Sequence, residues 1–365
     1  MGRGLQQRRL YRMLKYTDLK VAGRQNLRDI LPLSKPFTVL VEPTSLCNFR
    51  CVQCFQSLDE ENYFSRNIGH MPLDRFERVI QQLVDWPGPK LKVLKLSLYG
   101  EPMANRDFPE MLDIAAKSQV ADRIEVTTNA SLLTEKMAEH LVASQLDYLR
   151  VSIYATNQEA HEAVTGNKIG IDRIWNNLMT LKRVKERFNS QRPFVTCKKL
   201  DDFSSDNEYF LTRYSAVSDE TFIDKPHGWV KADKIDFIKR YYSEGSKVAL
   251  DDMRSRSSER TACPMPFTTM AVRNDGSVSP CCVDYAGGTN IGHVDASSLQ
   301  SIWESQGWLD FQKMQLEGRQ YENASCSACE VYKDDHYTRD NIDGFPVNRL
   351  LRNITQVAAR HPQES

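Results

Sequence analysis

Three cysteines near the start of the chain constrain its chemistry more than any other feature. Cys47, Cys51 and Cys54 are separated by three and then two residues, so one short loop can present three thiolates to one metal centre. Iron–sulfur clusters are usually held by four cysteines, and a three-cysteine loop leaves one iron of a cubane cluster without a protein ligand. Zinc fits less well, because structural zinc sites favour CxxC pairs and a closed tetrahedral ligand set. The spacing therefore favours a cluster with one iron open to another molecule.

Length and composition bound the rest of the chain. The 365 residues are enough for one large domain and a smaller one. The net charge is zero, which gives no indication of nucleic acid as a partner, and no apolar stretch approaches the roughly 18 residues of a membrane span. Residues 1–36 are basic and lack the apolar core of a secretory signal, so we expect a helical extension there. Nine cysteines without an export signal indicate metal binding in a reducing compartment, and we expect a cytoplasmic protein.

Residues 37–225 alternate strand-like and helix-like patterns, which is typical of βαβ units and a parallel sheet. Apolar stripes predict helices that begin after Pro72, at Phe108, after an N-cap at Thr134 and at Ile171. Six segments have the pattern of strands, the last of them the weakest: Phe37–Glu42, Leu91–Leu98, Arg123–Thr128, Tyr148–Tyr154, Pro193–Lys198 and Val217–Ile223.

Several predicted strands are polar on one face. Alternation along Tyr148–Tyr154 puts Arg150, Ser152 and Tyr154 on one side of the strand, and Lys95 lies on the corresponding side of the second strand. Parallel strands buried on both faces normally read as continuous apolar runs. A polar face therefore indicates a curved sheet around a polar cavity, although a sheet with one solvated face would give the same pattern. Right-handed crossovers favour the first arrangement, a partial (β/α)6 barrel.

Polar turns follow the first three predicted strands. The cysteine loop comes after the first strand, Gly100-Glu101-Pro102 after the second and Asn129 after the third. In α/β barrels the chemistry lies on the loops at the carboxyl ends of the strands. Each turn is a weak signal by itself, because turns use these residue types for their own hydrogen bonds. Their order after successive strands makes them one candidate site.

In these motifs the chain resembles the radical S-adenosylmethionine (SAM) superfamily over roughly residues 37–223. The resemblance implies a [4Fe–4S] cluster on the three cysteines, with SAM on the open iron and cleaved there to a 5′-deoxyadenosyl radical. Gly100-Glu101-Pro102 is similar to the family's GGEP turn, which receives the SAM amino group. Asn129 matches the Thr-Asn-Gly turn of the family, and Ser152 matches its polar residue near the SAM ribose and carboxylate.

The match departs from the family pattern at two positions. Tyr99 stands where the family has the first glycine of its GGEP turn, and the second glycine and the glutamate remain. Gln53 stands where the family has an aromatic or apolar residue against the SAM adenine. Phe49 or Phe55 is expected to supply that contact instead.

A second set of cysteines lies toward the C-terminus. Residues 271–278 predict a β-hairpin that brings Cys263 near Cys281. A CxxC pair further along completes a four-thiolate site with no open position, which suits zinc and a [4Fe–4S] cluster equally. The cysteines of this set are Cys263, Cys281, Cys282, Cys326 and Cys329.

This second set is similar to the auxiliary-cluster region of SPASM and twitch radical SAM proteins over about residues 263–330. Its spacing resembles that of the radical aminocyclitol dehydrogenases. Asp335 stands where a full SPASM domain has its next cysteine, so the shorter form with one auxiliary cluster is implied. Cys281 fits the ligand spacing better than Cys282, which would then be a spare thiol. The implied ligands of a second [4Fe–4S] cluster are Cys263, Cys281, Cys326 and Cys329.

Two clusters suit an oxidation. If a hydrogen atom is taken from a carbon that bears a hydroxyl, loss of one proton and one electron gives a ketone, and a closed second cluster can accept the electron. We therefore expect an oxidoreductase acting on a sugar, cyclitol or similar polar metabolite, with a flavodoxin or ferredoxin as reductant. Arg150 and Tyr154 are the candidates to bind this substrate or manage its proton, although a structural ion pair is the simpler role for Arg150.

Other functions are compatible with the same residues. A peptide maturase that forms crosslinks or thioethers is one, and a redox-neutral epimerase with Cys282 or Cys197 as hydrogen donor is another, although Cys197 is more simply a small buried residue. A non-catalytic zinc protein is the alternative outside enzymes. For the rest of the chain we expect a linker or lid over 226–262, the auxiliary domain over 263–335 and a polar tail over 336–365.

Overall fold

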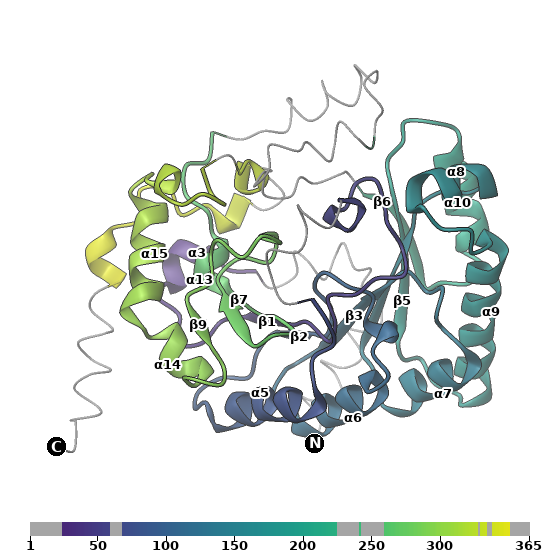
Figure 1. Ribbon diagram of the computed structural model, residues 1–365, viewed down its shortest axis with the longest axis horizontal. Coiled ribbons are helices and arrows are strands. Elements are labelled where there is room, and N and C mark those ends of the chain that lie inside the picture. Colours follow the sequence, from purple (N-terminus) through teal and green to yellow (C-terminus); the bar gives the residue numbers. More distant parts are fainter. Residues whose placement is uncertain are drawn as a thin grey trace.

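One nine-stranded sheet runs through both cysteine-bearing regions of the chain (Figure 1). The computed structural model describes residues 24–58, 68–224, 241, 259–327, 329–333 and 338–350. The strands are β1 (Thr38–Val41), β2 (Val93–Lys95), β3 (Ile124–Thr128), β4 (Tyr148–Ile153), β5 (Phe194–Leu200), β6 (Glu220–Asp224), β7 (Thr269–Val272), β8 (Ser277–Ser279) and β9 (Gly292–His293). Their order is β6-β5-β4-β3-β2-β1-β7-β8-β9, parallel from β6 to β7 and antiparallel beyond. The predicted α/β class, with a mostly parallel sheet, is confirmed.

The six predicted barrel strands correspond to β1 through β6, with bounds that differ by a few residues. The register explains the polar face that the sequence indicates. Lys95 on β2 is paired with Glu125 on β3, and Glu125 is paired with Tyr148 on β4. Paired residues of parallel strands share a face, so these side chains line one side of the sheet together. Arg150 lies two residues further along β4 on that same side.

Helices cover the opposite side of the sheet. α5 (Leu73–Asp85), α6 (Phe108–Ser118), α7 (Glu135–Ala143) and α9 (Ile171–Arg187) form an arc outside the strands in Figure 1, and all four are predicted from the sequence. The apolar residues of that side, such as Leu94, Val126 and Leu149, are completely buried in the main core. Burial of one such side chain contributes roughly 1.5–3 kcal/mol. Thr134 caps α7 as predicted, because its hydroxyl accepts a hydrogen bond from the Met137 amide at 3.2 Å.

The sequence does not predict two helices of the barrel, α8 (Gln158–Thr165) and α10 (Asp206–Tyr214). Each buries only two side chains, so neither has the wide apolar stripe on which such predictions depend. No helix in the described part of the chain is long and apolar enough to cross a membrane. The remaining helices are α3 (Leu27–Ile30), α13 (Met265–Thr268), α14 (Leu299–Trp303) and α15 (Gln306–Leu316).

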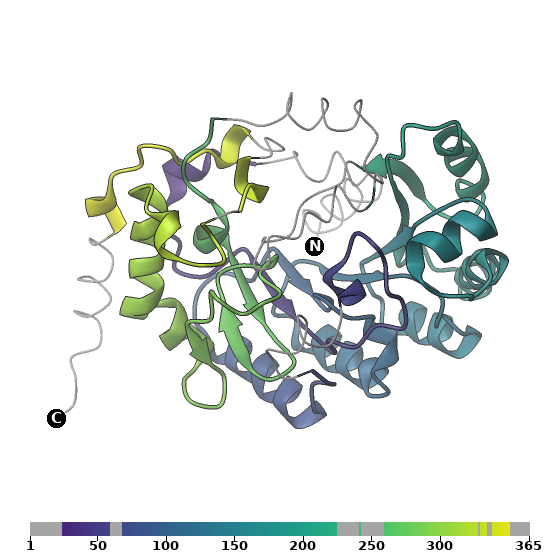
Figure 2. The ribbon, with the colours of Figure 1, turned by 45° about the horizontal axis from the view of Figure 1, so that its top comes forward.

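The predicted hairpin near the second set of cysteines is present as β7 and β8. Ala271 is paired with Ser279, and Val272 with Val278. Gly276 in the connecting turn has φ +92°, a left-handed conformation that suits glycine. The sequence does not predict that β7 pairs in parallel with β1, so the hairpin continues the barrel sheet instead of forming a separate one. Figure 2 shows the green hairpin beside the purple strand β1.

The beginning and the end of the described chain pack together. Ile342, Phe345 and Leu350 of the expected tail are buried against Leu27 and Phe267 in a second apolar core. Most of the segment 226–262, for which we expect a linker or lid, lies outside the described residues, as do residues 1–23 of the expected helical extension.

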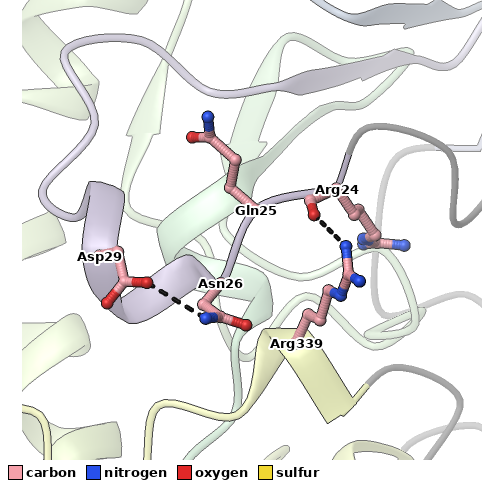
Figure 3. Close-up of a pocket in the computed structure, with 5 residues that line it drawn as sticks. All are labelled: Arg24, Gln25, Asn26, Asp29 and Arg339. Carbon is pink, nitrogen blue, oxygen red and sulfur yellow. Dashed lines mark hydrogen bonds between the residues drawn. The ribbon is translucent and has the colours of Figure 1, made fainter.

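A surface pocket of about 500 Å³ lies where these two ends meet (Figure 3). Arg24 forms a salt bridge with Asp340 at 2.7 Å, and Arg339 donates a hydrogen bond to the Arg24 carbonyl. Gln25, Asn26 and Asp29 complete the lining given by the described residues, and no cysteine is among them. The pocket is therefore separate from the predicted metal sites.

Candidate active site

The three cysteines of the first loop lie just beyond the end of β1. Cys47, Cys51 and Cys54 form no disulfide, and Cys51 interacts electrostatically with the other two. Burial raises the pKa of Cys47 to about 12 and the pKa of Cys51 well above its usual value. The thiolate is the form that binds metal, and burial makes its charge unfavourable unless a cation is bound. An iron–sulfur cluster would supply that charge, and the donor set fits it.

The three cysteines of this loop are not arranged to bind one metal ion together. In the described part of the chain, no three histidine, cysteine, aspartate or glutamate side chains are arranged to hold a single metal ion. A cubane cluster does not need such an arrangement, because its thiolates bind different irons. Amide groups that point at the sulfur are typical of cluster ligands, and the Phe49 amide donates to Cys47 Sγ at 3.5 Å.

Gly100 fixes the position of the cysteine loop. A Cβ atom at this residue would lie 2.2 Å from the Thr44 carbonyl oxygen and 2.5 Å from the Leu46 carbonyl oxygen. The next amide, that of Glu101, donates to the Leu46 oxygen at 2.9 Å. Only glycine permits this approach of two backbones. The second glycine of the GGEP-like turn is therefore required here.

The first position of that turn tolerates a side chain. The Tyr99 ring packs edge to face with Phe55 at 5.3 Å between centroids, so it extends away from the close backbone contact. The guanidinium of Arg273, from the auxiliary region, lies over the same ring at 5.7 Å. The Tyr99 side chain, which the family pattern lacks, thus connects the barrel to the second cysteine region.

Glu101 joins the end of β2 to the end of β3. Its carboxylate accepts hydrogen bonds from the Asn129 amide and the Thr128 hydroxyl, both at 2.7 Å. Burial raises the pKa of Glu101 to about 7, although these hydrogen bonds favour the ionised form. The Asn129 side chain in turn donates to Asn48 at 2.9 Å and lies 4.0 Å from Cys47 Sγ. The structure therefore brings these predicted SAM contacts together at the cysteine loop.

The unpredicted helix α8 also supports the cysteine loop. The amides of Arg50 and Val52 donate to the carbonyls of Thr165 and Val164 at 2.7 and 2.9 Å. Just after the helix, Asn167 donates to the Asn48 carbonyl at 2.6 Å. Sequence reasoning missed these contacts. The available signal was a helix start at Asn157 and a left-handed glycine end at Gly166, which α8 uses as caps.

Phe49 and Phe55, the predicted adenine contacts, are both packed inside the protein. Phe49 is 1% exposed, and its ring lies 6.1 Å from the Tyr154 ring and 5.6 Å from that of His161. Phe55 is stacked on Tyr285 with centroids 4.8 Å apart. An adenine contact from either ring stays a prediction.

Tyr154, a predicted catalytic residue, lies beside the first cluster site. Its hydroxyl makes a hydrogen bond with the Cys51 sulfur. Burial raises the pKa of Tyr154 well above its usual value, so the hydroxyl keeps its proton and acts as a donor. A role for Tyr154 toward the substrate stays a prediction, whereas its contact with the cysteine loop is observed.

Three polar side chains line the inner face of the sheet. Lys95, Arg150 and Ser152 are half-buried there, whereas their neighbours on the same strands are buried against the helices. Burial, followed by the positive charge of Arg150, lowers the pKa of Lys95 to about 7. Lys95 also interacts electrostatically with Cys282 of the second cysteine set. The polar face therefore adjoins the auxiliary region.

The second cysteine set converges from three segments. Cys263 precedes α13, and its thiol interacts electrostatically with Cys329, Cys326 and Cys282. Cys281 follows β8 and interacts with Cys282 and Cys263. Burial raises the pKa of all five thiols, so thiolates here also require a bound cation. The four predicted ligands fit an auxiliary cluster, and the preference for Cys281 over Cys282 stays a prediction.

A buried aspartate ties these segments together. Asp284 accepts hydrogen bonds from the Thr289 amide at 2.7 Å and from the Ser325 hydroxyl at 2.9 Å, and it lies 3.6 Å from the Arg273 guanidinium. The loop after β8 is thereby fixed to the segment that carries Cys326. Cys197 takes no part, because it is completely buried in β5, as expected for a small core residue.

The comparisons with known proteins agree with the two cysteine sites. Residues 41–192 match the radical SAM superfamily, and residues 263–330 match the iron–sulfur cluster-binding domain SPASM. The chain therefore carries a radical SAM domain followed by a SPASM domain. Such domains bind a [4Fe–4S] cluster with SAM and an auxiliary iron–sulfur centre, respectively, so the predicted types of cofactor are confirmed. Members of the radical SAM superfamily are enzymes.

Solved structures share this fold along most of the chain. BtrN in complex with AdoMet and 2-DOIA has a TM-score of 0.53 and 18% identity, over 83% of this chain and 97% of BtrN. SuiB of Streptococcus suis bound to the precursor peptide SuiA has a TM-score of 0.53 and 16% identity, over 91% of this chain and 80% of SuiB. Identities this low show the fold alone.

A curated relative matches a shorter region. The probable GTP 3′,8-cyclase of Methanococcus maripaludis is 30% identical over 125 residues, which are 33% of this chain and 38% of that protein. The chain thus spans well under half the length of this relative.

We expect Gly100→Ala to prevent assembly of the first cluster. The added methyl group would overlap the backbone of Thr44 and Leu46, so the cysteine loop would have to move. Iron per chain after anaerobic reconstitution should fall by about four. Gly170→Ala is the matched control, because a Cβ there meets only Gln158 Oε1 at 3.8 Å. Full iron content in Gly100→Ala would contradict the role given to this glycine.

We expect Tyr154→Phe to make the first cluster harder to reduce. Hydrogen bonds to cluster sulfurs help set the reduction potential, and one bond of about 1 kcal/mol corresponds to roughly 40 mV for a one-electron couple. The midpoint potential from an EPR-monitored redox titration should therefore become more negative by about that amount. Tyr214→Phe removes a buried hydroxyl elsewhere and should leave the potential unchanged. An unchanged potential in Tyr154→Phe would show that its hydroxyl does not act on the cluster.

We expect His161→Phe to stabilise the protein, most strongly in mild acid. His161 is 1% exposed, neither ring nitrogen has a hydrogen-bond partner among the described residues, and burial lowers its pKa. Below about pH 6.5 the unfolded chain therefore binds more protons than the folded one, and the native protein loses stability as the pH falls. The variant should melt at a higher temperature than wild type at pH 7.5, and by a larger margin at pH 5.5.

The surface variant His70→Gln controls for the loss of a histidine. Equal melting temperatures of wild type and His161→Phe at both pH values would mean that the buried imidazole costs nothing.

Proposed function

We propose that the protein is a radical SAM dehydrogenase that oxidises a hydroxyl-bearing carbon of a sugar, cyclitol or similar polar metabolite. An auxiliary [4Fe–4S] cluster at the second cysteine set would accept the electron. The observation that carries the proposal is the polar inner face of the sheet, which adjoins both cysteine regions. A hydrophobic substrate would find few partners on this face.

Residues of the polar face contact both cysteine regions. Ser152 and Tyr154 lie on β4 and just beyond its end, and Tyr154 touches Cys51 of the first site. Lys95 on β2 interacts electrostatically with Cys282, which lies beside the second site. It also interacts with Arg150 on β4. A polar substrate held on this face would thus have a cysteine site on each side. This placement suits removal of a hydrogen atom at one site and acceptance of an electron at the other.

When bound, the first cluster and SAM supply a radical that removes a hydrogen atom from carbon. The chain's own residues must hold the substrate and its hydroxyl proton. Arg150 cannot accept a proton, because a guanidinium stays charged in proteins. Its role in this proposal is therefore to donate hydrogen bonds to the substrate oxygen as negative charge develops there. Ser152 would be a second donor to SAM or substrate.

Peptide modification is the alternative enzyme function, because two proteins of similar fold were solved with bound peptides. SuiB was solved with a precursor peptide, and anSMEcpe, with a TM-score of 0.53 and 14% identity over 89% of this chain, was solved with the Cp18Cys peptide. These peptides were bound to SuiB and anSMEcpe. For this chain, the cationic polar face supports a small polar substrate better than an extended peptide.

Substrate-dependent release of 5′-deoxyadenosine tests the proposal. The holoenzyme would be incubated with SAM, a reductant and a panel of polyols and cyclitols labelled with deuterium at carbon. We expect deuterium to appear in deoxyadenosine and a carbonyl to appear in the product. Solvent deuterium at carbon without a carbonyl would indicate epimerisation instead. Deoxyadenosine release with peptides but with no polyol would overturn the proposed substrate class.

A further inference from the structure

Lys95 lies on the polar inner face of the sheet, in register with Glu125. Within the described residues its ammonium group makes no hydrogen bond and no ion pair, and it lies half-buried between the buried residues Leu94 and Leu96. A partly buried ammonium group loses part of its hydration, which is unfavourable unless a counter-ion or a bound molecule replaces the lost water. Among the described residues no carboxylate forms an ion pair with Lys95, and its amine is not fully buried, so a bound molecule can reach it.

The neighbours of Lys95 make its positive charge still less favourable. Arg150 on β4 and Lys198 on β5 both act on it as like charges. Lys198 has its own counter-ion, Asp224, at 2.7 Å. On β1 the paired neighbour is Leu40, which is apolar. Burial and these cations together lower the pKa of Lys95 to about 7.

Two other groups, Glu125 and Cys282, face Lys95 and favour its charged form, but among the described residues neither forms an ion pair with it. Glu125 on β3 is paired in register with Lys95, but it forms its salt bridge with Arg123. Cys282 approaches from the loop after β8, and burial raises the pKa of this thiol. An amine in such surroundings readily gives up its proton to water and can accept another from a bound molecule.

We propose that Lys95 is the base that takes the hydroxyl proton in the dehydrogenation, an inference that rests on the proposed function. The substrate carbon loses a hydrogen atom to the deoxyadenosyl radical, and the hydroxyl O–H bond breaks with its proton going to the Lys95 amine. The remaining electron passes to the auxiliary cluster as the C=O bond forms. Ammonium, ketone, deoxyadenosine and reduced cluster are the products.

Other groups on this face are less suited to the role. Arg150 stays protonated, and the raised pKa of Tyr154 keeps its hydroxyl protonated. Glu125 is a possible acceptor by its chemistry, but the guanidinium of Arg123 already holds its carboxylate. Lys95 is the amine that faces both Arg150 and the auxiliary loop.

Competitive acetylation of the holoenzyme tests the state of Lys95 without any substrate. Trace acetic anhydride would be applied from pH 5.5 to 9, and labelling of Lys95 would be followed by peptide mass spectrometry. The exposed Lys92, which pairs with Asp122, is the internal standard for reagent reactivity. We expect the labelling of Lys95 relative to Lys92 to be constant below about pH 7 and to fall above it, because the Lys95 amine is then already deprotonated whereas an ordinary lysine amine is not. A Lys95 that stays unreactive up to pH 9 would overturn the proposal.

Turnover then tests the catalytic role. With a polyol that the wild type oxidises, Lys95→Met should lower ketone formation by about 100-fold or more, the usual contribution of a general base. Deoxyadenosine should still form in this variant, so the ratio of ketone to deoxyadenosine falls. Lys95→Arg keeps the charge but cannot accept the proton, and should fail in the same way. Lys95→Cys alkylated with bromoethylamine should recover ketone formation, and Lys92→Met should match wild type.

The outcomes separate this inference from the proposed function. Wild-type ratios of ketone to deoxyadenosine in Lys95→Met and Lys95→Arg would overturn the base and leave the dehydrogenase standing. If the Lys95 variants retain wild-type turnover and Glu125→Gln uncouples it instead, Glu125 is the base. If no polyol gives a ketone with wild type, the dehydrogenase fails and Lys95 has no alcohol to deprotonate, whatever its labelling shows.

Discussion

The contact of Gly100 with the backbone of Thr44 and Leu46 is the constraint on which the first site depends. It holds the end of β2 against the cysteine loop at a distance that leaves no room for a side chain. From that contact Glu101 reaches the end of β3, and Asn129 returns to Asn48 beside Cys47. Three strand ends are thereby fixed relative to three thiols. A cluster and its ligand need this fixed arrangement, because positioning is the protein's main contribution to cofactor chemistry.

The same sheet also positions the second cysteine site. β7 pairs with β1, so the auxiliary region is joined to the strand that leads into the cysteine loop. Phe55, which follows Cys54, stacks on Tyr285 of the auxiliary region, and the apolar cluster around them packs against both Cys54 and Cys329. The separation between the two sites is thus set by backbone pairing and aromatic packing. It does not depend on a flexible link between two domains.

Features that depend only on residues close together in the sequence could be predicted. Alternation identified the strands, and cysteine spacing identified both sites, because those signals need only neighbouring residues. The sequence could not predict where Phe49 and Phe55 pack, since their burial depends on His161 and Tyr285, which are far away in the chain. Helix α8 was missed because it buries only two side chains, His161 and Thr165, so its sequence has no wide apolar stripe. Lys95 was placed on the polar face, but the sequence could not predict that its neighbours Glu125 and Lys198 pair with Arg123 and Asp224 instead.

The central claim is that one sheet carries two independent iron–sulfur sites. Iron and acid-labile sulfide should be measured after anaerobic reconstitution of wild type, of Cys47→Ala/Cys51→Ala/Cys54→Ala and of Cys326→Ala/Cys329→Ala. We predict about eight irons in wild type and about four in each variant. Mössbauer spectra of the two variants should then differ. About four irons in wild type, and none in the first variant, would contradict the claim, because the second site would then hold no cluster to accept an electron.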